Sequence, residues 1–98
     1  MEIIKNREGD HLGIALKGRL DTTTAPQLDE VIKSELDGVA SLGFDLAELD
    51  YISSAGLRVL LAAQKVMNKQ GSMKVYNVKD DIMEVFDITG FADILDIE

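Results

Sequence analysis

The chain has no cysteine and no tryptophan, and only one proline and one histidine, in 98 residues. Without cysteine, the protein can form neither a disulfide nor a thiolate metal site. A serine nucleophile needs a base, usually a histidine oriented by an acid, and His11 lies at the edge of a predicted hairpin, where we interpret it as an exposed turn residue. The sequence also lacks a Gly-x-Ser-x-Gly elbow and a glycine-rich phosphate loop. We therefore expect no catalytic residue, no metal site, no cofactor and no enzymatic activity.

Long apolar runs and an excess of basic residues are also absent. No apolar stretch approaches the roughly 20 residues of a membrane-spanning helix, and the N-terminus lacks the apolar core of a signal peptide. Acidic residues outnumber basic ones 18 to 10, for a net charge of −8. Because nucleic-acid binding relies on Lys and Arg at phosphates, we expect no nucleic-acid partner and no direct membrane insertion. We predict a single cytoplasmic domain over residues 1–98. A basic partner surface would complement its charge, unless the acidity serves only solubility.

The beginning of the chain shows the pattern of a β-hairpin. Residues 1–6 and 12–17 each alternate in part between apolar and polar side chains, and residues 7–10 between them are rich in turn formers. This arrangement predicts two antiparallel strands. Residues 18–24 have no clear period, so we interpret them as a loop.

A helix and a strand are predicted next. Thr23 or Thr24 can cap the helix, with Pro26 in its first turn, where the missing N–H costs nothing. Gly38 is expected to end it, and residues 42–47 then resemble a short strand. A strand directly after a helix suggests a β-α-β crossover with parallel pairing. The apolar residues of this helix recur at helical spacing: Leu28, Val31, Ile32 and Leu36.

The second half of the chain again shows a helix followed by a strand. A second helix is predicted from Ala55 to about Asn68, with so wide an apolar face that it should be deeply buried against a sheet. Residues 73–76 are expected to form a strand and a third helix to end near Gly90, whereas residues 91–97 fit either a short helix or a strand. The predicted fold class is therefore α/β, with a small mixed sheet of about four or five strands packed with about three or four helices.

Two adjacent serines, Ser53 and Ser54, precede the apolar run of the second predicted helix. Either serine can accept a hydrogen bond from the first helical turn and act as an N-cap. A helix N-terminus also favours negative charge, so it tolerates a phosphate. Ala55 and Gly56 favour a turn that stays open to a partner or a kinase, and Gly56 carries a helix-propensity penalty of about 1 kcal/mol relative to alanine. The residues alone thus leave two interpretations, a structural cap and a regulated serine.

The segment Ser53-Ser54-Ala55-Gly56-Leu57 resembles the phosphorylation motif of the STAS domain family, the bacterial anti-sigma factor antagonists. In that motif Asp-Ser-Ser/Thr-Gly-Leu precedes an apolar helix. Gly18-Arg19-Leu20-Asp21 is similar to the family's Gly-x-Leu-Asp loop. Residues 46–49 fit the strand and turn before the serine, and residues 85–91 resemble the family's late helix and its glycine-containing turn. The resemblance covers nearly the whole chain, in order, and implies a STAS-like fold.

The resemblance also implies which residues form the site. Ser53 stands where the family has aspartate, so the implied phosphoacceptor is Ser54, with Ser53 as the less favoured alternative. Arg58, one helical turn further along, is placed to pair with a phosphate. Asp21 either contributes to partner binding or only forms an Asx turn or helix cap. Since both loops follow strands that we expect to be parallel neighbours, they should emerge at one edge of the sheet. The predicted partner-binding residues are Asp21, Thr22, Thr23, Ser53, Ser54, Gly56, Leu57 and Arg58.

The function implied by the resemblance is partner switching. The unmodified domain binds an anti-sigma factor that is also a serine-protein kinase, phosphorylation of Ser54 ends the complex, and a PP2C-type phosphatase resets it. Two alternatives remain open. The chain could be a STAS subunit of another complex, such as a lipid-transport ABC system or a signalling scaffold, without control by phosphorylation. It could also bind a nucleotide or another small anion at the serine turn.

Overall fold

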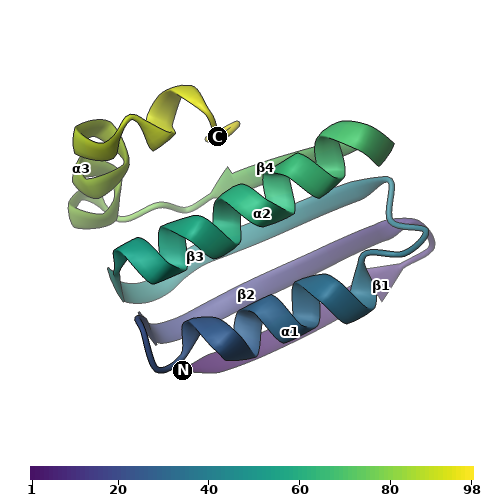
Figure 1. Ribbon diagram of the computed structural model, residues 1–98, viewed down its shortest axis with the longest axis horizontal. Coiled ribbons are helices and arrows are strands. Elements are labelled where there is room, and N and C mark those ends of the chain that lie inside the picture. The colour runs from purple at the N-terminus through teal and green to yellow at the C-terminus, as the bar shows by residue number, and fades with distance from the viewer.

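The computed structural model describes residues 1–98 and contains one four-stranded sheet and three α-helices (Figure 1). β1 is antiparallel to β2, whereas β2, β3 and β4 are parallel, and the strand order across the sheet is β1-β2-β3-β4. This architecture confirms the predicted mixed α/β fold, including the hairpin and the parallel crossover. The elements are β1 (Glu2–Glu8), β2 (His11–Leu20), α1 (Ala25–Glu35), β3 (Ser41–Ile52), α2 (Ser54–Gln70), β4 (Ser72–Tyr76), α3 (Asp80–Thr89) and a 3₁₀ turn, η1 (Phe91–Asp93).

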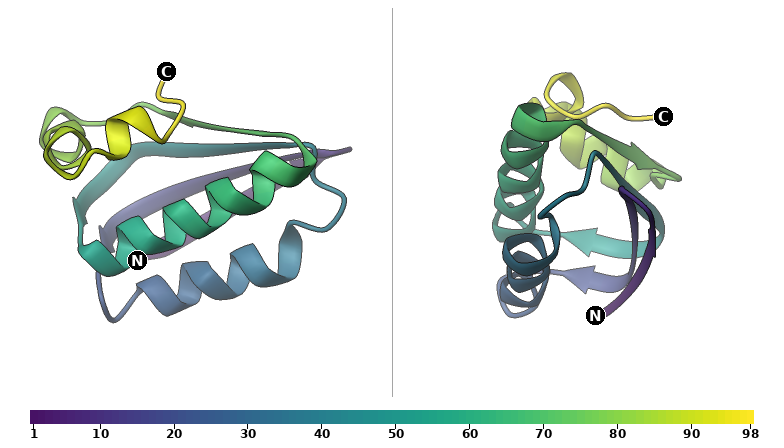
Figure 2. Two further views of the ribbon diagram at one scale, coloured as in Figure 1. Left: turned by 45° about the horizontal axis from the view of Figure 1, so that its top comes forward. Right: turned by 90° about the vertical axis from the view of Figure 1, so that its right-hand side faces the viewer.

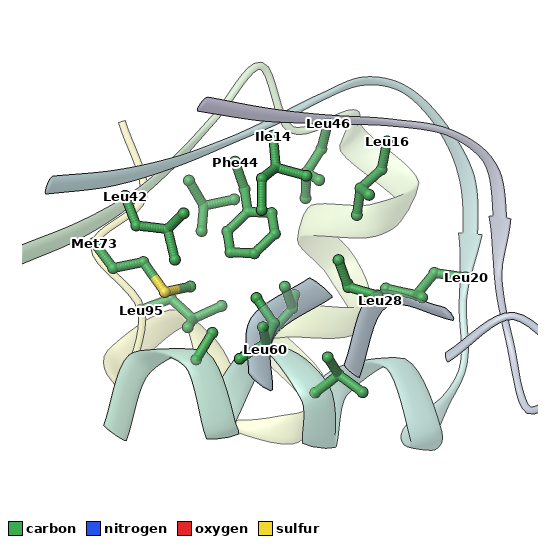
Figure 3. Packing of buried hydrophobic residues seen from close by; sticks show 14 of the residues in the cluster. Ile14, Leu16, Leu20, Leu28, Leu42, Phe44, Leu46, Leu60, Met73 and Leu95 are labelled. Atoms are coloured by element: carbon green, nitrogen blue, oxygen red, sulfur yellow. The ribbon is translucent and has the colours of Figure 1, made fainter. Parts of the chain in front are cut away.

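The core lies between the sheet and the two helices α1 and α2, which cover the same face of the sheet (Figure 2). Apolar side chains alternate along the strands because successive residues of a strand point to opposite faces. Those on the helix side interlock with the apolar stripes of the helices (Figure 3). The buried side chains include Leu12, Ile14 and Leu16 of β2, Leu42, Phe44 and Leu46 of β3, Leu28 of α1 and Leu60 of α2.

β2 extends beyond its predicted end at residue 17, so the prediction of a loop over residues 18–24 was wrong for its first three residues. β2 runs to Leu20, which is fully buried. Gly18 has a φ of 97°, a conformation that favours glycine. The pairing of β2 with β3 shifts register on both sides of Lys17 and Gly18. This irregularity interrupts the alternation of apolar and polar residues that is typical of a strand. For that reason the sequence pattern did not indicate a strand there.

β3 is also longer than the predicted strand over residues 42–47, because it continues to Ile52. In its second half the buried residues Leu46, Leu49 and Ile52 recur every third position instead of every second. The register explains this spacing, since β3 has extra residues relative to β2 at two places. The bulges let both strands reach the same edge of the sheet with Leu20 opposite Ile52.

The C-terminal segment combines both structures that its sequence allowed. After α3, which ends at Gly90 in the left-handed conformation with a φ of 82°, η1 forms a short helical turn. Ile97 then makes a parallel bridge to Val75 of β4. α2 begins at Ser54 and ends at Gln70, one residue earlier and two residues later than predicted.

Candidate functional site

The loop after β2 and the turn after β3 lie next to each other. Leu20 and Ile52 are register partners at the ends of these parallel strands, and the Ser53 N–H donates to the Leu20 carbonyl oxygen at 2.9 Å. α1 and α2 therefore both start at the same edge of the sheet, on the left of Figure 1. This confirms the expectation that the Asp21 loop and the serine turn emerge together.

Asp21 organises its loop through local hydrogen bonds. Its Oδ1 accepts from the Thr23 backbone N–H at 3.0 Å, the Thr23 hydroxyl at 2.8 Å and the Thr24 backbone N–H at 3.1 Å. The Thr23 hydroxyl is the main reason that the pKa of the Asp21 carboxyl lies below its ordinary value; burial opposes this effect, and the backbone bonds add to it. The alternative reading of Asp21 as a local Asx turn thus has a structural basis, and the docking role stays a prediction.

The predicted capping of α1 by a threonine side chain was wrong. Thr24 occupies the N-cap position of α1, but its side chain makes no hydrogen bond to the first helical turn. Its hydroxyl instead donates to the Arg19 carbonyl oxygen at 2.8 Å and accepts from the Asp21 N–H at 2.8 Å. Thr24 therefore closes the loop back onto the end of β2.

The two serines have different environments. Ser53 is the N-cap of α2, and its half-buried hydroxyl accepts from the Gly56 N–H at a long 3.4 Å. Its carbonyl oxygen accepts from the Leu57 N–H at 3.0 Å. Ser54 is the first residue of α2 and is exposed, and its hydroxyl makes no hydrogen bond within the chain. The cap and the exposed hydroxyl are thus separate residues.

Gly56 and Leu57 do not lie on the surface. Both are buried, Leu57 with 5% of its surface exposed. A Cβ at Gly56 would lie 2.6 Å from Leu20 Cγ and 3.0 Å from Ile52 Cγ1. The interpretation that Gly56 keeps the turn open was therefore wrong, because the close approach is to the protein's own core. These two residues help to position the serine turn without offering side-chain surface to a partner.

Arg58 lies on the surface beside a shallow hollow between α1 and α2. The hollow has a volume of about 290 Å³ and is lined by Thr22, Ala25, Pro26, Asp29, Ala55, Arg58 and Val59. Arg58 takes part in none of the six ion pairs of the chain. Asp29, the acidic residue of this hollow, is already paired with Lys33 at 2.9 Å. The Arg58 guanidinium is thus available to an anion one helical turn from Ser54.

Sequence reasoning missed a second feature of this edge, an exposed pair formed by Arg19 and Tyr51. The two residues are register partners at the ends of β2 and β3. The Arg19 guanidinium carbon lies 4.1 Å from the centroid of the Tyr51 ring, within the range of a cation–π interaction. Arg19 Nε also lies 3.7 Å from Asp21 Oδ2. The strand pairing creates this contact, so only a correct register could have revealed it.

Comparison with known proteins agrees with this arrangement. A model of the STAS domain matches residues 2–98. The chain belongs to the STAS domain family. The anti-sigma-B factor antagonist of Listeria monocytogenes is 34% identical to it over 98 residues, which cover 97% of this chain and 85% of that protein. The anti-sigma-B factor antagonist of Bacillus subtilis is 35% identical, with 96% of this chain and 86% of that protein covered.

Solved STAS structures share the fold. An anti-sigma factor antagonist from Mycobacterium paratuberculosis superposes with a TM-score of 0.87 at 21% identity, over 98% of this chain and 83% of that one. The unphosphorylated form of the anti-sigma factor antagonist SpoIIAA gives a TM-score of 0.79 at 16% identity, covering 99% and 87%. Its phosphorylated form gives 0.78 at 17% identity, covering 99% and 91%.

The names of these STAS relatives describe regulatory proteins and not enzymes. His11 is exposed, as predicted, but it is the first residue of β2 and not a turn residue. Its Nδ1 lies 2.6 Å from the Ser41 hydroxyl oxygen. None of the helices combines the length and the apolar character that crossing a bilayer would need.

Proposed function

We propose that this protein is an anti-sigma factor antagonist that works by partner switching. In its unmodified form it binds an anti-sigma factor with serine-protein kinase activity in the cytoplasm, and the bound sigma factor is released. Phosphorylation of Ser54 ends the complex, and a PP2C-type phosphatase restores the unmodified form. The observation that carries this proposal is an exposed serine at the start of α2, in a chain whose relatives include proteins named anti-sigma-B factor antagonists.

The environments of the two serines support Ser54 as the phosphoacceptor. A kinase must bring the hydroxyl oxygen of its substrate to the γ-phosphate of ATP, which requires an accessible side chain. Ser54 is exposed and its hydroxyl is free. The Ser53 hydroxyl is half-buried and engaged by the Gly56 N–H, so its modification would remove the N-cap of α2.

The folded domain can carry the phosphate with little rearrangement. A phosphoserine adds about −1.5 to −2 charges at neutral pH. The N-terminus of α2 favours this charge, because its unpaired N–H groups and its dipole face the modified residue. Arg58, on the same side of α2 as Ser54 and free of ion pairs, can form a charge-assisted hydrogen bond with the phosphate. Both the unphosphorylated and the phosphorylated form of SpoIIAA share the fold of this chain, with TM-scores of 0.79 and 0.78.

We place the docking surface at the edge where α1 and α2 begin. Its members are the exposed or half-buried residues of the predicted set, namely Asp21, Thr22, Thr23, Ser53, Ser54 and Arg58. In this arrangement a phosphate on Ser54 lies inside the contact area. It opposes binding by its volume and by the cost of removing its charge from water. A loss of about 1.4 kcal/mol weakens binding tenfold, so a modest penalty is enough to exchange partners.

The site assignment is tested with the anti-sigma factor kinase of the same organism and ATP, followed by intact mass measurement. We expect the wild-type protein to gain one phosphate, Ser54→Ala to gain none and the matched control Ser53→Ala to gain one. If Ser54→Ala still gains a phosphate, or if only Ser53→Ala fails to gain one, the assignment of Ser54 is wrong.

The switch itself is tested by calorimetric titration of the same kinase with unmodified and phosphorylated protein. We expect phosphorylation to weaken binding at least tenfold, while the far-UV circular dichroism spectrum stays unchanged. Equal affinity of the two forms would contradict partner switching even if Ser54 were the modified residue.

A further inference from the structure

Most of the basic side chains in this protein are engaged by neighbours in the fold. Six of the ten form ion pairs with carboxylates, and a seventh, Arg7, donates to the backbone carbonyls of Gly9, Glu35 and Asp37. The six that form ion pairs are Lys5, Lys17, Arg19, Lys33, Lys74 and Lys79. In a chain with a net charge of −8, such pairing is expected, because acidic partners are plentiful.

The three basic residues without a partner all belong to α2: Arg58, Lys65 and Lys69. All three are exposed. At about 100° of rotation per helical residue, they fall with Ser54 within an arc of about 60°. At about 1.5 Å per residue, the line from Ser54 to Lys69 is about 22 Å long. We call Arg58, Lys65 and Lys69 the basic ridge. α2 packs its other side on the sheet, so the ridge runs along its outer side (Figure 2).

No acidic residue of α2 balances the ridge. The whole segment over residues 51–79 contains five Lys or Arg residues and no Asp or Glu, although acidic residues dominate the rest of the chain. The two other basic residues of this segment, Lys74 and Lys79, lie outside α2 and are paired with Glu98 and Asp50. The ridge is therefore the one place where positive charge stays uncompensated along a helix face.

We propose that the basic ridge is a docking surface for an acidic face of the anti-sigma factor kinase, an inference that rests on the proposed function. The overall charge of −8 suggested a basic partner surface, but the charge along the helix that starts at Ser54 has the opposite sign. Complementary charges steer encounter and fix the register of a complex. Carboxylates on the partner would form ion pairs with the three ridge cations, which have none within the chain.

The position of the ridge also suggests how phosphorylation of Ser54 would weaken the contact between the ridge and the acidic face of the partner. Ser54 lies at the N-terminal end of the ridge and on the same side of α2. A phosphate there pairs with Arg58 and places about −1.5 to −2 charges beside the acidic face of the partner. One modification then removes a cation from the interface and adds a repulsive anion. This repulsion acts in addition to the steric effect of the phosphate.

A protein partner fits the ridge better than a polyanion. Recognition of anionic lipids typically uses clusters of four to eight basic residues, and the ridge has three, spread over about three turns. Its neighbours on α2 are the half-buried Leu61 and the exposed Ala62 and Val66, of which Val66 has 37% of its surface exposed. The net charge of −8 also repels nucleic acids and anionic membranes at longer range.

The test compares two double variants with the same change in net charge. Lys65→Glu/Lys69→Glu reverses two ridge cations, whereas Lys17→Glu/Lys74→Glu reverses two cations on β2 and β4. Lys74 is flanked by the buried Met73 and Val75, so its side chain leaves the sheet on the side away from the helices. The neutral versions, Lys65→Gln/Lys69→Gln and Lys17→Gln/Lys74→Gln, provide a milder pair. Each variant is first checked for cooperative urea unfolding.

Binding of each variant to the anti-sigma factor kinase is then measured at several salt concentrations. We expect the reversed ridge variant to bind at least tenfold more weakly than wild type, the neutral ridge variant about threefold more weakly and both controls within twofold. The affinity of wild type should fall with rising salt, and that of the ridge variants should change less. If the ridge and control variants bind alike, the inference is wrong although the proposed function stands. If wild type does not bind the kinase, the proposed function fails first.

Two further measurements decide between classes of partner. Wild type and the ridge variants are incubated with vesicles containing phosphatidylglycerol and with a single-stranded oligonucleotide at physiological salt. We expect no binding by any of them. Binding by wild type that the ridge variants lose would assign the ridge to a membrane or a nucleic acid and overturn the proposal.

Discussion

Gly56→Ala puts a methyl group where the structure has almost no space. The new Cβ would lie 2.6 Å from Leu20 Cγ, 3.0 Å from Leu20 Cδ2 and 3.0 Å from Ile52 Cγ1. Leu20 is fully buried and Ile52 is only 4% exposed, so neither side chain can swing into solvent. Overpacking of this kind costs about 1 to 3 kcal/mol. The better helix propensity of alanine recovers about 1 kcal/mol. We expect a net loss of about 1 kcal/mol in the free energy of unfolding.

Urea unfolding, followed by circular dichroism, measures this loss. A domain of this size has a total stability of about 5 to 15 kcal/mol, so the variant should stay folded with a lower midpoint. A decrease of 1 kcal/mol corresponds to about 4 to 8 °C in the thermal midpoint. Ala62→Gly, at an exposed position of the same helix, measures the propensity contribution by itself and should cost about 1 kcal/mol. If Gly56→Ala is more stable than wild type by that amount, the close contact with Leu20 has no energetic weight and the reasoning fails.

A double-mutant cycle tests the contact directly. Leu20→Ala removes both Leu20 atoms that the new methyl group would meet. By itself it should cost about 2 to 5 kcal/mol, because it leaves a cavity. In that background Gly56→Ala should become neutral or stabilising, giving a coupling energy of about 1 to 3 kcal/mol between the two positions. Additive effects would show that the strain arises elsewhere.

Three further predictions concern the loops at the same edge. Ser53→Ala should lower the free energy of unfolding by about 0.5 to 2 kcal/mol, because it removes the N-cap of α2, whereas Ser54→Ala should stay within about 0.5 kcal/mol in the same urea assay. The Asp21 carboxyl has a lowered pKa in the folded state, so its ionised form stabilises the fold above the ordinary pKa of about 3.9, and this contribution is lost as the pH falls through the folded value. Acid unfolding of Asp21→Asn should accordingly show a shallower loss of stability below about pH 4, and an unchanged profile would refute this assignment. Replacing Arg19 and Tyr51 by alanine singly and together should give a coupling energy of about 0.5 to 1 kcal/mol at this exposed pair, and zero coupling would mean that the contact does not hold in solution.

Local patterns were sufficient where an element follows one regular period. The hairpin over β1 and β2 came from alternation around turn formers, and α1 came from Leu28, Ile32 and their helical spacing. Gly90 marked the end of α3 because glycine readily adopts the left-handed conformation that ends a helix there. In each case the relevant information lies within a few residues of the chain.

Local patterns failed where strand pairing introduced an irregularity. Leu46, Leu49 and Ile52 are spaced for neither a regular strand nor a helix, and only the bulged pairing with β2 makes them one buried row. The pair of Arg19 and Tyr51 depends on the same register. The role of Thr24 was misassigned for a related reason, since its hydroxyl reaches back to the end of β2 instead of forward to α1.

The sequence by itself determined the α/β class, the STAS resemblance and the choice of the two serines as the candidate site, because all three depend on residue types at short spacings. Only the tertiary structure shows that Ser53 is the cap of α2 and that Ser54 has a free hydroxyl. Only the tertiary structure shows that Gly56 and Leu57, predicted to lie on the partner surface, are buried in the core. It also showed which basic residues lack partners, since four of the six ion pairs join residues that are distant in the chain. Exposure, register and charge pairing are properties of the packed molecule, and for that reason the proposed docking surface depends on the tertiary structure.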